Sequence, residues 1–456
     1  YPLHCARWMI ERSDDAREAL LRITGRRGVN ASLLAGWLLS IGQTSAVKEV
    51  LAVLDSQEAL PMLWRASLSD DANERQQFIA AAEHCHAHNV RFPNSLDEVQ
   101  MLQSLGDSAF ARYLLGCFWY SKRRYDEAVS CWRETLEKSP DYAPAHRLLG
   151  VYSWNKQQDA TQALAYLQRA VALEPDNARF LFELDFLQKL LARPVHERLT
   201  TLVERKAVVL KRDDLTAELL SLWNASGHYA DAAAILDTRV FHPWEGGEGK
   251  ITGQYLLNQL HRALQFIERG AFKQATDCLK AALRYPDNLG EGRLPGQTDN
   301  DIWYLLGYCA EQAGDAQQAA EYYQLARQGG STLDAGRYYN DQPADYLFWQ
   351  GIALRKSGNP AQAEQHFRHF IDWAAQHRDD VPQVDFFAVS LPDLVVLDVS
   401  AQQRHQQHCL FIEALGHLGL GNVSACQQRM QQLLQINPAH DKAHLIRHAL
   451  QSGIFS

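Results

Sequence analysis

One pattern of small and large side chains recurs along the chain, and it restricts the fold more than any other feature. In the segment AFARYLLGCFWYSKRRYDEAVSCWRETLEKSPD, residues 109–141, Gly116 is followed by Ala128, Trp132 and Pro140. Small residues at the first two positions let two helices approach closely, and the large residues fill the space towards the next unit. Proline ends the second helix because it lacks an amide donor. The segment therefore predicts a helical hairpin that stacks on its neighbours.

The same spacing recurs in whole or in part at least seven times. The small residue of the second helix falls at Ala128, Ala163, Ala232, Ala275, Ala319, Ala363 and Cys426. One residue is inserted between Gly150 and Ala163, and residues 177–211 are expected to form a divergent unit. Self-similarity at this period is typical of solenoids. We therefore predict an all-α fold, a right-handed superhelical solenoid of helical hairpins.

The strength of the pattern divides the chain into three predicted regions. They are degenerate helical repeats over 1–108, the solenoid over 109–438, and a C-terminal capping helix within 439–456. A terminal cap needs a polar outer face for solubility. We interpret the stripe of His440, His444 and His448 as that solvated face.

The later units are longer than the earlier ones. The interval is 35 residues from Ala128 to Ala163, but 43 from Ala232 to Ala275 and 44 for each of the next two units. The excess lies between one hairpin and the next. It predicts long inter-repeat loops over 240–252, 285–300, 328–343 and 375–401. Equivalent junctions align along one edge of a solenoid, so these loops should share one rim, where insertions often form a binding face.

The first two of these loops, FHPWEGGEGKIT and DNLGEGRLPGQTDN, both contain Gly-Glu-Gly and lie one unit apart. They should touch, and together they offer candidate binding residues. These are His242, Trp244, Glu245, Glu248, Glu291 and Arg293. A sugar could stack on Trp244 and bond to the carboxylates, a cation could take the Glu and His ligands, or a partner protein could use Trp244 as its anchor. A purely structural role, with Trp244 filling a gap and glycines at positive φ, is the competing interpretation.

A second candidate surface is the concave groove, which the first helix of each hairpin lines in this class of solenoid. Aromatic residues recur on those helices, and they could anchor a peptide or a helix. The candidates are Trp119, Tyr152, Trp303 and Trp349. Spacing alone does not separate groove aromatics from core aromatics.

Composition and missing motifs exclude several functions. A net charge of −9 and a pI near 6.1 argue against nucleic-acid binding, and no apolar run is long enough for a membrane span. The eight cysteines contain no C-x-x-C pair, which predicts reduced thiols in a cytoplasmic protein. His84 and His88 stand at i, i+4, but no second pair has ligand spacing. We predict no catalytic residue, no metal and no cofactor.

The repeats resemble the tetratricopeptide family over roughly 109–439. The words FHPWEGGEGK and YPDNLGEGR, in that order and separation, resemble a narrower group, the C-terminal repeat region of large bacterial proteins of the YphG type. In that group a β-rich domain, similar in architecture to sugar-mutarotase-like β-sandwiches, precedes the repeats. The resemblance implies an upstream domain of the same polypeptide as a possible partner, and it implies no catalytic residue.

These observations predict a non-catalytic scaffold for protein–protein or interdomain interactions, with a protein or peptide partner. The alternative is the helical half of a carbohydrate-active or carbohydrate-binding protein, in which the rim loops complete a ligand site with the upstream β-rich domain. The scaffold would bind a protein and ignore sugars, whereas the alternative would use Glu245, Glu248 or Glu291 to bind the ligand.

Overall fold

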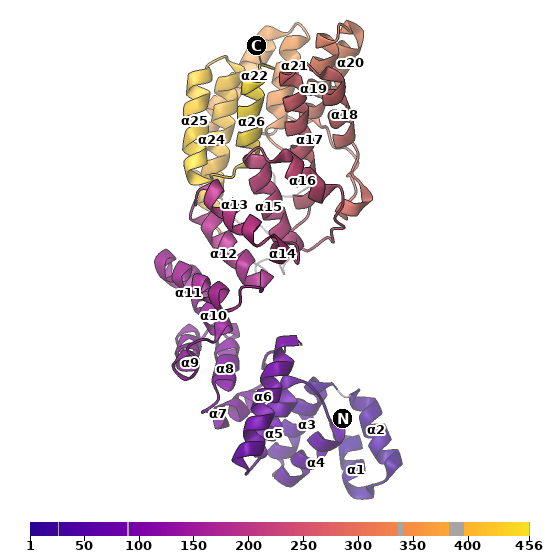
Figure 1. The fold of residues 1–456 in the computed structure, drawn as a ribbon, viewed down its shortest axis with the longest axis vertical. Coiled ribbons are helices and arrows are strands. Elements are labelled where there is room, and N and C mark those ends of the chain that lie inside the picture. Colours follow the sequence, from indigo (N-terminus) through magenta and orange to yellow (C-terminus); the bar gives the residue numbers. More distant parts are fainter. Residues whose placement is uncertain (26, 89–90, 336–340, 383–395, 456) are drawn as a thin grey trace. The chain divides into compact units, whose positions relative to one another are not determined.

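The computed structural model describes residues 1–25, 27–88, 91–335, 341–382 and 396–455 (Figure 1). These residues form helices joined by turns and loops, and no β-strand occurs among them. The predicted all-α fold is confirmed. No helix in these ranges has the length and apolarity that crossing a membrane requires.

The chain divides into two compact units, which we call unit 1 (Tyr1–Glu174) and unit 2 (Pro175–Ser456). Within unit 1 the helices follow in the order α1 (Pro2–Glu11), α2 (Asp14–Thr24), α3 (Gly28–Ser40), α4 (Thr44–Leu54), α5 (Ala59–Leu68), α6 (Ala72–His88), α7 (Leu96–Ser104), α8 (Ala109–Ser121), α9 (Tyr125–Lys138), α10 (Ala143–Tyr152), η1 (Ser153–Gln157) and α11 (Ala160–Leu173). Helix α7 contacts both α5 and α8, so the first hundred residues and the hairpin that follows share one core.

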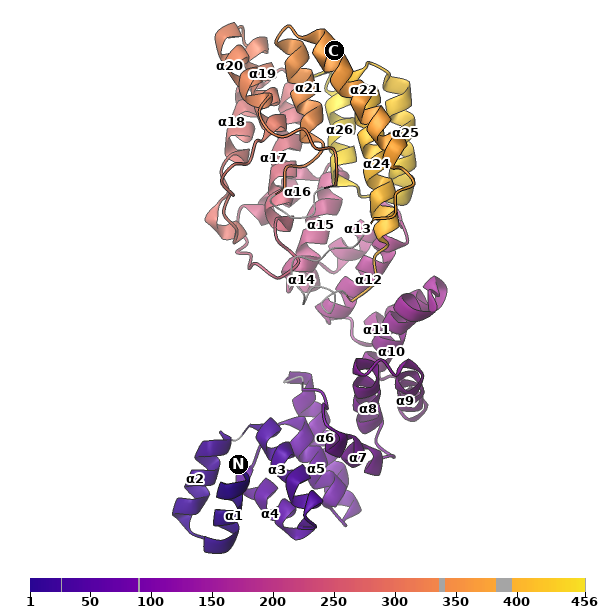
Figure 2. The ribbon, with the colours of Figure 1, turned by 180° about the vertical axis from the view of Figure 1, so that it is seen from behind.

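Unit 2 continues the hairpins with longer connections. Its helices are α12 (Ala178–Leu190), α13 (Val195–Glu204), α14 (Lys206–Val209), α15 (Asp213–Ala225), α16 (Tyr229–Leu236), α17 (Lys250–Glu268), α18 (Phe272–Ala282), η2 (Asp287–Leu289), α19 (Asn300–Gln312), α20 (Ala316–Ala326), α21 (Tyr346–Lys356), α22 (Pro360–His377), α24 (Ala401–Gly419), α25 (Val423–Ile436) and α26 (Asp441–Gln451). Consecutive helices pair as hairpins, and Figure 2 shows the pairs from behind.

The repeat pattern forms hairpins in both units for the same steric reason. A Cβ atom added at Gly116 of α8 would lie 2.4 Å from Nε1 of Trp132 on α9. At Gly307 of α19, a Cβ would lie 2.6 Å from the Tyr323 ring on α20. Each large side chain thus occupies the space that the glycine leaves open. The predicted pairing of small and large positions is confirmed at these contacts.

The one-residue insertion between Gly150 and Ala163 is absorbed inside a helix. Helix α10 ends in a π-helical turn, Ser153–Gln157, and Gln158 follows it in the left-handed region with φ 56°. A π turn closes its hydrogen bond over one more residue than an α turn, so it can absorb one extra residue within the helix. Ala163 therefore keeps its place in the helix contact, where it is fully buried.

The C-terminal helix corrects one interpretation made from the sequence. Helix α26 contacts α15 and α17 as well as α25. His444 is 8 % exposed, and the side chain of His448 is 11 % exposed. The predicted solvated histidine face is therefore wrong, because this face packs against helices that come more than 170 residues earlier in the chain.

Candidate functional site: a cavity beneath the rim loops of unit 2

The first rim loop, residues 237–249, joins α16 to α17. Its conformation depends on Trp244, on a glycine that leaves space for the indole ring, and on two glycines with positive φ. The half-buried indole of Trp244 lies over Gly247, where an added Cβ would come within 2.0 Å of the ring. The Lys250 ammonium lies 6.0 Å from the centroid of the Trp244 ring. Gly246 and Gly249 have φ values of 79° and 73°. The loop conformation thus depends on glycines that a larger residue could not replace without strain.

The second rim loop, residues 283–299, contacts the first through backbone and side-chain hydrogen bonds. The amide of Phe241 donates to the Asn288 carbonyl at 2.8 Å, and the Asn288 side chain donates to two carbonyls of the first loop region. The amide of Gly249 donates to Oε2 of Glu291 at 2.9 Å. The two loops are therefore in contact, as their separation by one unit predicts.

Gly290 is required where the two loops meet. Its φ is 80°, and an added Cβ would lie 2.5 Å from the carbonyl oxygen of Phe241. Gly292, two residues further on, has no atom within 4 Å of the equivalent position. One glycine of this Gly-Glu-Gly word is thus needed for loop contact, and the other is not.

The six predicted binding residues of the rim loops do not form a single cluster. The His242 side chain is 81 % exposed, while its amide donates to Asp213 at 3.0 Å. Arg293 pairs with Asp299 and donates to the Leu283 carbonyl, which ties the second loop to its own preceding helix. Glu245 and Glu248 are exposed. Of the six predicted residues, Glu248 and Glu291 line the cavity described next.

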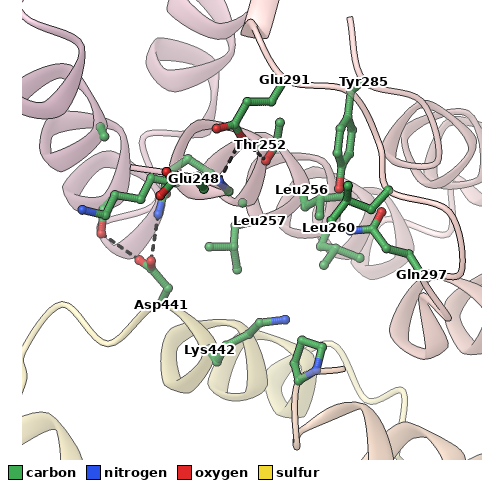
Figure 3. Close-up of a pocket in the computed structure, with 18 of the residues that line it drawn as sticks. Glu248, Thr252, Leu256, Leu257, Leu260, Tyr285, Glu291, Gln297, Asp441 and Lys442 are labelled. Atoms are coloured by element: carbon green, nitrogen blue, oxygen red, sulfur yellow. Dashed lines mark hydrogen bonds between the residues drawn. The ribbon is translucent and has the colours of Figure 1, made fainter. Parts of the chain in front are cut away.

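A cavity of about 770 Å³ lies beneath the first three rim loops. The third rim loop, residues 327–345, contributes its described residues Asp341, Gln342 and Pro343, and helices α12, α15, α17, α19, α21 and α26 complete the wall. We call this space the rim-loop cavity, and Figure 3 shows its interior. Its volume falls in the range typical of ligand pockets. Part of the fourth predicted loop, residues 383–395, lies outside the described residues.

One wall of the rim-loop cavity rests on a buried ionic network. Arg198 of α13 is 2 % exposed and donates to both carboxylate oxygens of Asp185 at 2.9 and 2.6 Å. It also bonds to Glu218 at 2.9 Å, and Lys189 bonds to Glu218 at 2.8 Å. Burial alone would raise the pKa of Glu218, but the Lys189 and Arg198 charges outweigh it and lower that pKa to about 2. Two cations and two carboxylates thus balance within the wall.

A second ionic group stands where α26 meets the first helices of the hairpins. Lys442 lies 3.2 Å from Asp345 and 3.8 Å from Asp301. Asp441 accepts hydrogen bonds from Ser221 and Gln254, both at 2.7 Å, and so joins α26 to α15 and α17 (Figure 3). These residues were absent from the sequence-based candidates, because only the return of α26 brings them to the cavity.

The predicted groove aromatics divide between half-buried positions and the core. Trp119 receives the Arg124 guanidinium at 5.4 Å, and Tyr152 lies 6.5 Å from Tyr125, both on half-buried side chains of unit 1. Trp303 stacks on Tyr322 in unit 2. Trp349 requires a correction: it is 1 % exposed, so in this structure it belongs to the core and is not an open anchor.

The groove itself is occupied by the chain's own C-terminal segment. The first helices of four hairpins, α15, α17, α19 and α21, contact this segment through hydrogen bonds and ring contacts. Tyr304 donates to the Ile454 carbonyl at 3.2 Å, and the Trp349 ring lies 5.7 Å from Phe455. His448 stacks on Tyr229 and His261, with its Nδ1 2.9 Å from Nδ1 of His261. In unit 2 the groove is therefore a packed interface.

The thiols and histidines show no metal site within the described part of the chain. No group of three or more His, Cys, Asp or Glu side chains there is arranged to hold an ion. All eight cysteines are unpaired thiols, and burial raises the pKa of Cys117, Cys309 and Cys426 to about 12. The side chain of His88 lies outside the described residues.

Comparison with known proteins supports the repeat class. The tetratricopeptide repeat family model matches residues 119–178 and 260–336. Together with the glycine–aromatic packing described above, this match identifies tetratricopeptide repeats over these two segments of the chain.

Solved structures of three proteins are similar over most of their length. The human IFIT1 dimer with PPP-AAAA is 14 % identical with a TM-score of 0.26, and the match covers 93 % of this chain and 95 % of that one. Yeast Tom70 is 12 % identical with a TM-score of 0.32, covering 99 % and 94 %. The Cut9–Hcn1 hetero-tetramer of APC/C is 11 % identical with a TM-score of 0.23, covering 100 % and 92 %.

Proposed function

We propose that this protein is a non-catalytic scaffold that binds a protein partner at the rim-loop cavity of unit 2. Tetratricopeptide repeats typically serve as protein-interaction scaffolds, and the family match supports that class. The observation that carries the location is the convergence of three long insertions on one cavity of about 770 Å³. Insertions on one face of a repeat array often form its binding face.

Occupation of the groove supports this location. The first helices of the unit 2 hairpins already contact α26 and the residues after it. A peptide entering that groove would have to displace a packed helix and lose its buried apolar contacts. The rim-loop cavity needs no such displacement, so we favour it as the site in unit 2.

The contacts of the rim residues favour a scaffold over a carbohydrate site completed by another domain. Glu291 accepts from the Gly249 amide and lies 3.4 Å from the Thr252 hydroxyl, which engages its carboxylate in loop contact. Trp244 covers Gly247, so one ring face is occupied by its own loop. A stacking platform and a ligand-binding acid would both need these groups to face the ligand. Here Glu291 joins the two loops, and Trp244 packs within the first loop.

The partner to test first is the β-rich domain that the sequence resemblance places before the repeats. Calorimetric titration of this separately produced domain into the chain should give saturable binding. Gly290→Ala introduces a Cβ at φ 80° against the Phe241 carbonyl and should separate the rim loops. We expect at least a loss of about tenfold in affinity, equivalent to about 1.4 kcal/mol.

Gly314→Ala is the matched control, because it adds a Cβ at a similar φ of 82° that meets no atom within 4 Å, in the turn between α19 and α20 and outside the cavity lining. It should bind like the wild type. Equal affinities for all three proteins would show that the rim loops do not form the binding site. Absence of binding by the wild type would rule out the β-rich domain as the partner.

A further inference from the structure

The rim-loop cavity carries an excess of negative charge. Six Asp and Glu residues and three Lys residues line it. One of these lysines, Lys189, and one of the acids, Glu218, are already balanced within the wall network with Arg198 and Asp185. The remainder of the lining therefore contains five carboxylates and two ammonium groups. Because a cavity wall screens charge less than bulk water does, this excess favours a cationic occupant.

Lys442 leaves part of this charge unbalanced. It is the cation nearest to Asp301, at 3.8 Å, and it also pairs with Asp345 at 3.2 Å. Asp441, its neighbour in sequence, adds a third carboxylate to the same corner. One ammonium among three carboxylates leaves two negative charges over, so the corner can accept another cation.

Asp301 is the buried acid of this corner. It is 2 % exposed, and its Oδ1 accepts the amide of Ile302 at 2.9 Å. Its Oδ2 forms a long ion pair with the Lys442 ammonium at 3.8 Å, which is beyond hydrogen-bonding distance. Burial raises the pKa of Asp301, and Lys442 opposes this only in part. A ligand N–H that reached Oδ2 would add a charge-assisted hydrogen bond to this carboxylate.

The α17 face of the cavity carries an apolar cluster. Leu256 and Leu260 of α17 lie beside Tyr285, and Leu257 lies between these leucines and Glu248, across the cavity from Lys442 (Figure 3). Leu257 and Leu260 are buried. A ligand that fits both parts has an aliphatic stem and a cationic head, since such stems bury along apolar surface while the head meets carboxylates.

We propose that the rim-loop cavity binds an organic cation on an aliphatic stem, namely the lysine or arginine side chain of a partner segment. This inference rests on the proposed function for its protein partner, and it names the group that the cavity recognises. The head bonds to Asp301, and the stem lies along the α17 leucines. The acidic wall discriminates against acidic segments by charge repulsion.

The test uses the full chain and four short peptides. They are Ac-Gly-Lys-Gly-amide, Ac-Gly-Arg-Gly-amide, the neutral isostere with norleucine in place of lysine, and the glutamate analogue. Binding is measured by ligand-observed NMR at low ionic strength. The lysine and arginine peptides should bind at least about tenfold more tightly than the norleucine peptide, as expected for a hydrogen bond to a charged group. The glutamate peptide should bind more weakly still.

Variants locate the interaction. Asp301→Asn keeps the shape and removes the charge, and it should weaken lysine-peptide binding by about tenfold. Glu248 is an exposed acid of the cavity wall, so Glu248→Gln removes a cavity charge without disturbing the core and provides a second test if Asp301→Asn proves unstable. Asp277→Asn on the exposed face of α18 removes the same formal charge away from the cavity and should bind like the wild type.

Three results would overturn the inference. They are equal binding of the norleucine and lysine peptides, equal weakening by Asp301→Asn and Asp277→Asn, and no measurable binding of either cationic peptide. These outcomes are separate from the proposed function. If the β-rich domain binds through the rim loops but the cationic peptides do not, the partner site stands and its cationic specificity fails. If the peptides bind and the domain does not, the specificity stands and the partner is another protein.

Discussion

The two units build their hairpins alike and join them differently. In unit 1 the residues between α9 and α10 are 139–142, and in unit 2 those between α18 and α19 are 283–299. Gly116 faces Trp132 in the first case, and Gly307 faces Tyr323 in the second. The packing within a hairpin is thus preserved, while the insertions between hairpins are free to vary. The repeat packing therefore determines the hairpin framework, and the long junctions of unit 2 create the cavity.

Two ion pairs, one in each unit, differ strongly in burial. Unit 2 buries Arg198 between Asp185 and Glu218, whereas Arg169 of unit 1 pairs with Asp141 at the surface. Arg198→Met would leave the buried Asp185 without its bidentate partner. We expect it to lower the free energy of unfolding by about 3–5 kcal/mol, measured by urea titration, with hydrogen exchange locating the loss in unit 2.

Arg169→Met is the matched change in unit 1. Both partners of that pair are at least half exposed, so the loss should stay within about 1 kcal/mol. If the two variants lost a similar amount of stability, burial would not explain the expected difference between the Arg198 and Arg169 ion pairs.

The small position of the hairpin contact can be tested in unit 1 alone. Ala128 of α9 is fully buried, and its carbonyl lies 3.0 Å from the position that a Cβ on Gly116 would take. Ala128→Arg should overpack this contact and cost at least about 1–3 kcal/mol, seen as a lower melting temperature. Ala165→Arg places the same side chain on an exposed position of α11 and should change stability by less than about 0.5 kcal/mol. An unchanged melting temperature for Ala128→Arg would contradict the repeat alignment.

The sequence predicted the hairpins well because their signals are local. Gly116 and Ala128 are close in sequence, and each large residue that fills the contact follows within a few positions. The contact of the first two rim loops was also predictable, because repeats place equivalent junctions next to each other. Here the Gly249 amide meets Glu291 across 42 residues.

The packing of the C-terminal histidines and the ionic group at the cavity could not be predicted in the same way. Both depend on the return of the C-terminal segment to earlier helices, and no repeat signal indicates that return. Polarity suggested that His440, His444 and His448 face solvent. A neutral imidazole also packs against aromatic rings, as His448 does against Tyr229. The sequence does not show whether a given histidine is neutral or charged. Asp301 and Lys442 entered the candidate site only through that same return.

The smallest expected effect concerns the N-terminal cap of helix α26. This cap is a histidine, so its contribution to the stability of unit 2 should depend on pH. His440 precedes α26, and its Nδ1 accepts the amide of Ala443 at 3.2 Å, so that nitrogen must be unprotonated. Burial lowers the pKa of His440 to about 4 from its ordinary 6.5. His440→Ala should cost about 1 kcal/mol near neutral pH through loss of the helix cap. Urea unfolding measures it.

The pH dependence follows from the direction of that shift. Because the pKa is lower in the folded state, the unfolded chain binds more protons between pH 6.5 and 4. The stability that His440 contributes is complete above pH 6.5 and is lost as the pH falls towards 4. His440→Asn retains a side-chain acceptor for the cap and removes this titration. It should therefore lose less stability than the wild type between about pH 7.5 and about pH 5. An equal loss would show that the other buried histidines of α26, His444 and His448, carry the acid sensitivity, since burial lowers the pKa of both.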